Sequence, residues 1–318
     1  MLTWKSIGRW SVALTLSLTS VVQAAPPTFW PTWGDGKAEV STYSLLQPRY
    51  GAERPGKVVL IFVTETFSES SRVKADPGKH PPSDEFPVLK LNELRAFQTG
   101  IYDYHVMTSV FSHVEKRGAR LAGEPTKITF SSQEWCGQVY HQLRFDARSV
   151  RDQQHSYFDG EGSLDRALPL PSGFLTADEL PIRLRGLLDE LVPPGESRHF
   201  PFLPSLRYVR LLHKPLAWTE TTVKRAAGTE SVTVSAGTFE IQKWEVSPQV
   251  GQSTTWWIEK NPPHRIIRWH GNDGEQAELL ASERLPYWTL NKPGDEKTLD
   301  ALKLTPLTPP APLTPPTP

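Results

Sequence analysis

Glu134, Cys136 and His141 form the chain's strongest candidate for catalytic chemistry, within the stretch "TFSSQEWCGQVYHQL" (129–143). Cys136 is the single cysteine, and a thiolate nucleophile needs a nearby base and access to solvent. His141 could act as that base and Glu134 could orient it, which would make a cysteine-dependent hydrolase. Alternatively, Cys136 packs as a small apolar residue, forms a disulfide between molecules, or binds a metal.

The geometry of an extended strand bears on these alternatives. Side chains alternate between the two faces of a strand, so Glu134 and Cys136 share one face and His141 points to the other. A β-bulge at Gly137 would reverse the faces of every residue after it. We therefore expect the three side chains to share a face only if Gly137 forms a bulge.

Two further groups of side chains are candidates for ligand contacts. The first surrounds the cysteine and consists of Gln133, Trp135 and Gln138. The second lies in "HSYFDGEG" (155–162), where His155, Asp159 and Glu161 have even spacings and would share one face of an extended chain. A structural turn fits this second stretch as well, because an Asp-Gly pair favours tight hairpins.

Other chemistries lack their signatures. The sequence has no G-x-S-x-G, H-E-x-x-H or C-x-x-C motif, so serine esterases and the common zinc sites have no support. The stretch "GAERPGK" (51–57) has phosphate-loop spacing, but Val58 replaces the required Ser or Thr and an apolar strand follows it. We predict no metal and no cofactor, and we favour a protein that is not an enzyme.

The N-terminus indicates export. Lys5 and Arg9 precede an apolar core of about a dozen residues, and small residues follow, so we expect a signal peptide over residues 1–24, cleaved after Ala24. Cleavage would change the net charge from zero to −2, which argues against a nucleic-acid partner. No later segment is long and apolar enough for a transmembrane helix. The expected location is periplasmic or secreted.

Most of residues 25–290 alternate apolar and polar side chains with the two-residue period of strands, and "SLRYVRLL" (205–212) is one of the strands that this pattern predicts. The denser run "GKVVLIFVTETF" (56–67) predicts a strand buried on both faces. Short connections without regular strand–helix alternation favour a mainly β domain, an antiparallel barrel or sandwich-like sheets. In the strand "STTWWIE", Trp256 and Trp257 must point to opposite faces, so one is expected in the core.

One central helix is predicted over about 176–191. Leucines recur there at helical spacing, and Thr176 with Glu179 matches a capping box. The surrounding residues, 165–197, would be the meeting point of two β-rich halves. The proline-rich end, 291–318, is expected to be a disordered tail that could serve as a spacer or dock a partner.

Several stretches carry a resemblance, among them "GKAEVSTYSLLQPRYG", "LIFVTETF", "KLNELRAFQTGIYDYHVMTSVF" and "HSYFDGE". They resemble an uncharacterised family of exported bacterial proteins that are often named "septum formation inhibitor Maf". The stretches "ESVTVSAGTFEIQKWEV" and "STTWWIEKNPPHRIIRW" are similar to periplasmic β-barrel proteins of unknown function. Neither resemblance implies a catalytic residue.

The preferred hypothesis is an exported cell-envelope protein that binds an apolar or amphipathic ligand, such as a lipid, because curved sheets and barrels often enclose such cavities. The first alternative is the hydrolase that uses Cys136 and His141. The second is a structural protein of the envelope that interacts through its proline-rich tail.

Overall fold

The computed structural model describes residues 24–307. Residues 1–23, which hold nearly all of the expected signal peptide, lie outside the described residues. Residues 308–318, the end of the expected tail, also lie outside them. Within the described part, no helix is long and apolar enough to cross a membrane.

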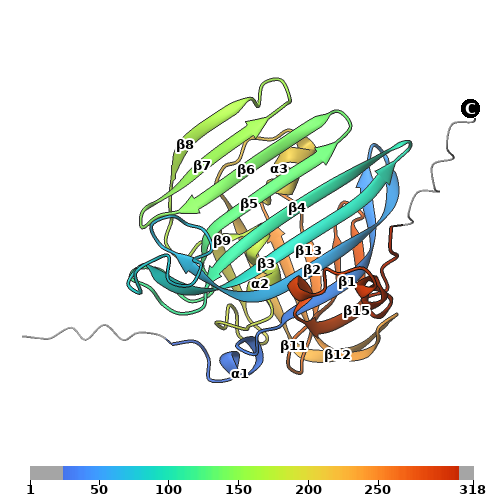
Figure 1. The fold of residues 1–318 in the computed structure, drawn as a ribbon. Coiled ribbons are helices and arrows are strands. Elements are labelled where there is room, and N and C mark those ends of the chain that lie inside the picture. The colour runs from blue at the N-terminus through green and yellow to red at the C-terminus, as the bar shows by residue number, and fades with distance from the viewer. Residues whose placement is uncertain (1–23, 308–318) are drawn as a thin grey trace, which may run out of the picture.

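Fifteen strands form one sheet (Figure 1). The first eight are β1 (Ala38–Arg49), β2 (Ala52–Ser68), β3 (Glu85–Thr99), β4 (Tyr102–His113), β5 (Pro125–Glu134), β6 (Gly137–Phe145), β7 (Ser149–Ser156) and β8 (Ser163–Pro169). The others are β9 (Leu175–Thr176), β10 (Ser197–Leu203), β11 (Thr219–Val234), β12 (Gly237–Pro248), β13 (Thr254–Glu259), β14 (Ile266–Gly271) and β15 (Gln276–Leu285).

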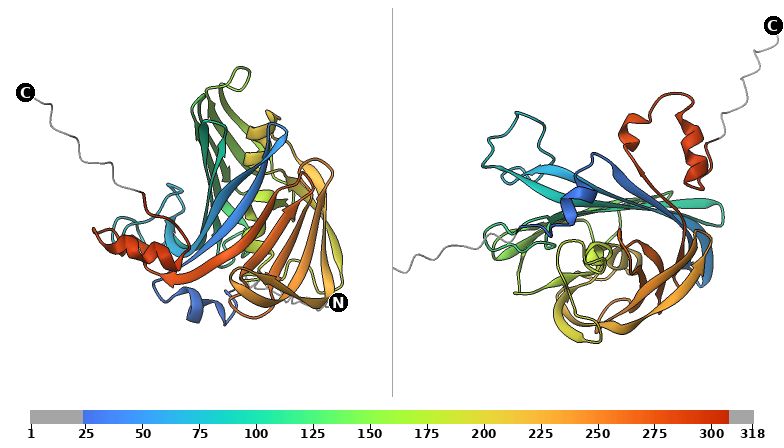
Figure 2. Two further views of the ribbon diagram at one scale, coloured as in Figure 1. Left: turned by 90° about the vertical axis from the view of Figure 1, so that its right-hand side faces the viewer. Right: turned by 90° about the horizontal axis from the view of Figure 1, so that it is seen from below.

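The sheet is two antiparallel meanders joined side by side. One runs from β8 back to β1, the other runs from β15 back to β9, and β1 pairs with β15. All the pairs are antiparallel except β9 with β10. The sheet curls strongly around its concave face, but β8 and β9 remain its two edges, so the barrel is not closed (Figure 2). The expected mainly β fold is confirmed in this open form.

Strand β2 contains the dense apolar run of the sequence, and apolar residues cover it on both faces. Leu60 and Phe62 are buried in the main core on the concave face. Val63, with Val59 and Ile61 beside it, joins a small cluster on the convex face, where Leu302 covers the strand. The predicted burial of both faces is therefore confirmed.

The helices are short. They are α1 (Phe29–Trp33), η1 (Ala177–Glu179), α2 (Leu180–Arg183), α3 (Leu206–Leu212), η2 (Tyr287–Thr289), η3 (Asp295–Lys297) and α4 (Thr298–Ala301). The prediction of one helix over 176–191 is wrong in length. Its capping box is present, with Thr176 and Glu179 bonding each other's backbone, but the α-helix ends at Arg183. Gly186 then turns the chain with φ +63°, and Arg185 leaves the helical path to pair with buried Glu39 at 2.8 Å.

The stretch "SLRYVRLL", expected to be a strand, forms helix α3 instead. Ser205 caps its N-terminus by accepting the backbone N–H of Tyr208 at 3.0 Å. Its buried residues are Leu206, Val209, Arg210 and Leu211, of which Leu206, Val209 and Arg210 share one face at helical spacing. The segment 170–216 holds the edge strands β9 and β10 together with η1, α2 and α3, and these helices lie on the concave side of the sheet (Figure 2).

Residues 291–307, part of the expected disordered tail, are folded against the sheet. Helices η3 and α4 lie within these residues, and Leu302 is 6% exposed against β1 and β2. The hydroxyl of Thr42 donates to the Leu302 carbonyl at 2.7 Å, which fixes this segment to the convex face. An apolar contact thus orders residues that the proline content assigns to a tail.

Both halves of the chain share one core. It contains Phe62, Leu91 and Phe130 from the first meander and Trp244 and Ile258 from the second. Leu180, Leu184 and Leu188 of the connecting segment fill the centre. As expected, Trp256 is buried and stacks on Trp269 at 5.4 Å, while neighbouring Trp257 points outward and bonds Glu230 at 2.9 Å.

Candidate functional site

Gly137 does not form a bulge. It pairs directly with Glu134, so Trp135 and Cys136 are the two turn residues of the β5–β6 hairpin. The hairpin turn, and not a bulge, places Glu134 and His141 on the same concave face. His141 pairs directly with Phe130, so these two side chains share a face, and Glu134 lies four residues after Phe130 on the same strand and therefore points to that face as well. The expectation that a shared face requires a bulge is wrong for this reason.

Cys136 is separated from the rest of the proposed catalytic group. It lies exposed in the turn, four to five residues from His141 along β6, a distance of about 13–16 Å. Its backbone N–H donates to the Glu134 carboxylate at 2.6 Å. A hydrogen bond with Glu134 and the charge of that carboxylate raise the pKa of the thiol, which is the opposite of what a nucleophile needs.

His141 has a different partner, Asp152 of β7. Its Nε2 atom lies 2.5 Å from Asp152 Oδ1, and both side chains are buried. Arg166 of β8 donates from Nε to the other oxygen of Asp152 at 2.8 Å. Burial opposes ionisation of Asp152, but the hydrogen bonds from His141 and Arg166 outweigh it and lower its pKa.

The second candidate group spans the end of β7 and the β7–β8 turn, as the turn alternative describes. His155 is exposed on the convex side of β7, and Asp159 is exposed in the turn. Glu161 points the other way, where it accepts the Ser156 hydroxyl at 2.8 Å and pairs with His213 after α3. Gln133, Trp135 and Gln138 are also exposed around the neighbouring hairpin turn.

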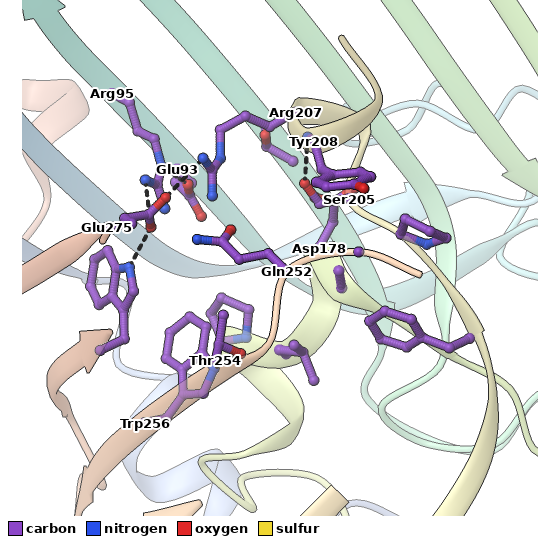
Figure 3. Close-up of a pocket in the computed structure, with 18 residues that line it drawn as sticks. Glu93, Arg95, Asp178, Ser205, Arg207, Tyr208, Gln252, Thr254, Trp256 and Glu275 are labelled. Carbon is purple, nitrogen blue, oxygen red and sulfur yellow. Dashed lines mark hydrogen bonds and ion pairs between the residues drawn. The ribbon is translucent and has the colours of Figure 1, made fainter. Parts of the chain in front are cut away.

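Helix α3 separates two hollows inside the curled sheet. The first, shown in Figure 3, lies between β3, η1, α3 and β14. Its open volume is about 50 Å³, which holds one or two waters at about 30 Å³ each. We call it the inner pocket.

The inner pocket is held together by Glu275. Its carboxylate accepts Arg95 at 2.9 Å and the indole N–H of Trp269 at 2.7 Å, and Arg207 of α3 lies 2.8 Å away (Figure 3). Burial raises the pKa of Glu275, but the charges of Arg207 and Arg95 outweigh it and lower the pKa to about 2. This network fastens α3 to the sheet and leaves little room for a ligand.

Asp178 lies on the opposite wall of the inner pocket (Figure 3). Its Oδ2 atom accepts the backbone N–H of Leu206, the first residue of α3, at 3.0 Å. Burial raises the pKa of this carboxyl to about 7. The start of α3 is therefore held by a group that titrates near neutral pH.

The second hollow, which we call the α3 pocket, lies between β6, β7, β8 and α3. Its volume is about 600 Å³, within the usual 300–1,000 Å³ of small-molecule sites. Its apolar lining comes from Val139, Leu164, Val209, Pro215 and Leu216. Its charged and titratable lining comes from His141, Glu161, Arg166, Arg210, His213 and Lys214. Two predicted site residues, His141 and Glu161, meet here, and Glu134 lies behind the wall.

Arg210 is the most buried cation of the α3 pocket. Its side chain is 4% exposed, and its guanidinium carbon lies 3.7 Å from the ring centre of Phe158. Arg210 Nη1 lies 3.4 Å from His213 Nε2, a long hydrogen bond, whereas Glu134 is 3.8 Å away and among the described residues no group accepts the buried Nε–H. Burial lowers the pKa of Arg210. The guanidinium is thus incompletely paired beside an open cavity.

Sequence patterns did not indicate Asp152, Arg166 or Arg210. Asp152 and Arg166 belong to strands where alternation allows either face to be the buried one. Arg210 belongs to a segment that was expected to be a strand. Arg210 follows Leu206 by four residues, the spacing of one helix face, and this was the available signal.

Comparison with known proteins returned two solved structures of low sequence identity and low structural similarity. No family model and no curated protein matches the chain, so the name "Maf" has no support. A β-barrel-like protein with a domain of unknown function, DUF1849, from Brucella abortus has a TM-score of 0.45 and 9% identity, covering 82% of this chain and 98% of that chain. A protein from Bacteroides fragilis, described as exported and with a YmcC-like fold, has a TM-score of 0.23 and 13% identity, covering 77% and 95%.

Proposed function

We propose that this protein is an exported, non-catalytic binding protein whose ligand has an anionic head and a single apolar tail. The ligand occupies the α3 pocket. The observation that supports this most is Arg210, a buried and incompletely paired guanidinium on the wall of a 600 Å³ cavity. A carboxylate or phosphate head would supply the partner that the protein leaves open.

The balance of charge in the pocket favours an anion. Arg166, Arg210 and Lys214 contribute three positive charges to the lining, and Glu161 contributes the one carboxylate. Glu161 is already engaged with His213 and Ser156. Arg166 is engaged with Asp152, which leaves Arg210 and Lys214 to attract an incoming head group.

The rest of the lining suits an apolar tail. Leu164 comes from β8, Leu216 from the segment after α3, and Val139 from β6. Burial of one methylene of such a tail contributes about 0.8 kcal/mol, so a short chain is sufficient for micromolar binding once the head group is paired. The inner pocket cannot take this role because its volume is about 50 Å³.

Native mass spectrometry of residues 25–318, after incubation with a bacterial envelope lipid extract, tests the proposal. We expect one anionic single-chain lipid to remain bound per protein. In Leu164→Trp, the larger side chain should fill the α3 pocket and abolish the bound mass. Absence of an enriched ligand, or equal retention by Leu164→Trp, would overturn the proposal.

A further inference from the structure

Four hairpins end at the same end of the sheet (Figure 1). They connect β1 with β2, β3 with β4, β5 with β6, and β7 with β8. Each carries one large, highly exposed apolar side chain at its turn, and we call the four together the tip row: Tyr50, Ile101, Trp135 and Tyr157. Their exposed fractions are 60, 79, 70 and 70%.

Such exposure is concentrated at this end. Among residues 24–307, five large apolar side chains are at least 60% exposed, and four of them make up the tip row. The fifth is Leu307, the last described residue. Large exposed apolar patches mark sites of interaction, whereas single exposed residues need no explanation.

The tip row is linked by aromatic contacts beneath it. The hydroxyls of Tyr50 and Tyr104 lie 2.9 Å apart, and Tyr102 contacts Tyr104 at 5.9 Å between ring centres. Tyr102 also contacts Trp135 at 6.4 Å. A continuous band of rings therefore joins three of the hairpins.

The turns themselves are unusual for exposed hairpins. Two-residue turns favour Asn-Gly or Asp-Gly pairs, but this end has Tyr50-Gly51, Gly100-Ile101 and Trp135-Cys136. Tyr50 has φ +54°, a left-handed conformation that asparagine or glycine adopts more readily than tyrosine. Solubility and turn geometry would both favour polar residues here, so the apolar ones point to a partner.

We propose that the tip row binds the protein to the surface of a lipid bilayer. Tyr and Trp are favoured at the membrane–water interface, where an apolar ring and a polar group are both accommodated. The four side chains expose about 400–700 Å² in total, less than the roughly 800 Å² per partner of a stable protein interface. The three two-residue turns carry no charge, and the β7–β8 turn carries the exposed carboxylate of Asp159, so apolar burial, and not attraction to anionic lipid, drives the association.

The surface is separate from the ligand-binding proposal, although both concern the same end of the molecule. The α3 pocket is lined by Gly160 and Gly162 of the β7–β8 turn, next to Tyr157. A protein bound in this way would therefore present the α3 pocket close to the bilayer. Bilayer binding does not require Arg210, so each proposal can fail without the other.

Cys136 allows a direct test because it is the single cysteine and lies exposed beside Trp135. An environment-sensitive dye on Cys136 of residues 25–318 is titrated with phosphatidylcholine vesicles, with and without phosphatidylglycerol. We expect a blue shift with both vesicles, quenching by shallow spin-labelled lipid, and persistence in high salt. Ile101→Ser and Tyr157→Ser should each lower partitioning roughly tenfold.

The control places the dye at the opposite end, in Cys136→Ser combined with Val73→Cys. Its emission should not change with vesicles, and Arg210→Gln should partition like the wild type. Loss of binding in high salt, equal partitioning of Ile101→Ser and wild type, or an equal response from the Val73→Cys dye would overturn the proposal. So would light scattering that shows lipid-free self-association abolished by Ile101→Ser, which would assign the surface to a second copy.

Discussion

The ring of Tyr157 lies directly over the backbone of Gly137. A β-carbon built on Gly137 would be 2.5 Å from Tyr157 Cδ1 and 2.8 Å from its Cβ, closer than real contacts allow. The glycine that sequence patterns suggested as a bulge is therefore needed for close packing between the β5–β6 and β7–β8 hairpins. This contact also holds Tyr157 in the tip row.

Gly137→Ala should displace the Tyr157 ring and lower the free energy of unfolding by about 1–3 kcal/mol, the usual effect of overpacking. Chemical denaturation measures it. Gly228→Ala is the matched control, because a β-carbon at Gly228 has nothing within 4 Å and should change stability by less than about 0.5 kcal/mol. Equal stability of the two variants would contradict the packing role of Gly137.

Glu275→Gln should destabilise the fold by about 3–5 kcal/mol, because it leaves Arg95 and Arg207 buried without their shared carboxylate. Glu278→Gln removes a partly exposed ion pair with Arg268 and should cost less than about 1 kcal/mol. Denaturant titration compares the two. If Glu275→Gln were no more harmful than Glu278→Gln, the inner pocket would not anchor α3.

The buried carboxylate of Glu275 should also make the stability of the fold sensitive to acid. Its pKa is lowered to about 2 from 4.5, so ionised Glu275 contributes stability above pH 4.5 that is lost as pH falls toward 2. The wild type should therefore lose more stability than Glu275→Gln between pH 5 and pH 3. Parallel stability curves over that range would show that the Arg95 and Arg207 contacts do not hold the charge.

The buried carboxyl of Asp178 should make the stability of the fold decrease as the pH rises toward neutral, the opposite of the effect of Glu275. Its pKa is raised to about 7 from 3.8, so the folded state keeps a proton that the unfolded state has released. Stability should therefore fall as pH rises from 4 to 7 and then level off. Asp178→Asn keeps an oxygen for the Leu206 N–H and should reduce this fall by about 1–2 kcal/mol. An unchanged pH profile would contradict the buried proton.

Cys136 should react slowly with iodoacetamide in the folded protein at neutral pH, although it is exposed, because Glu134 raises the pKa of its thiol. Glu134→Gln removes the negative charge and should increase the alkylation rate at a fixed pH near 8. Fast alkylation of the wild type at pH 7, unchanged by Glu134→Gln, would instead revive the cysteine hydrolase.

Period-two alternation predicts the strands well because the sheet has a buried concave face along most of its length. It misassigns α3, since "SLRYVRLL" reads equally as a strand and only the Ser205 cap and the contacts of Leu206 with the core favour a helix. The central helix is too long in the sequence prediction because Gly186 turns the chain with φ +63° and Arg185 pairs with buried Glu39, a tertiary contact that leucine spacing does not indicate.

The candidate site was predicted in part. His141 and Glu161 were singled out and do line the α3 pocket, but their partners are Asp152 and His213, which strand spacing cannot identify. The sequence offers Cys136 as a candidate nucleophile, but the residue lies exposed at a hairpin turn. Positions across a hairpin or a helix–sheet contact depend on tertiary structure, which no local pattern encodes.

Calorimetric titration of residues 25–318 with dodecanoate and with dodecyltrimethylammonium tests the central claim most directly, because the two probes share a tail and differ in head charge. We predict that dodecanoate binds one site at least roughly tenfold more tightly than the cation, since Arg210 lacks a full partner. In Arg210→Gln, with an unchanged circular dichroism spectrum, this preference should disappear. Equal binding of both probes to the wild type, or a preference retained in Arg210→Gln, would contradict an anion-binding α3 pocket.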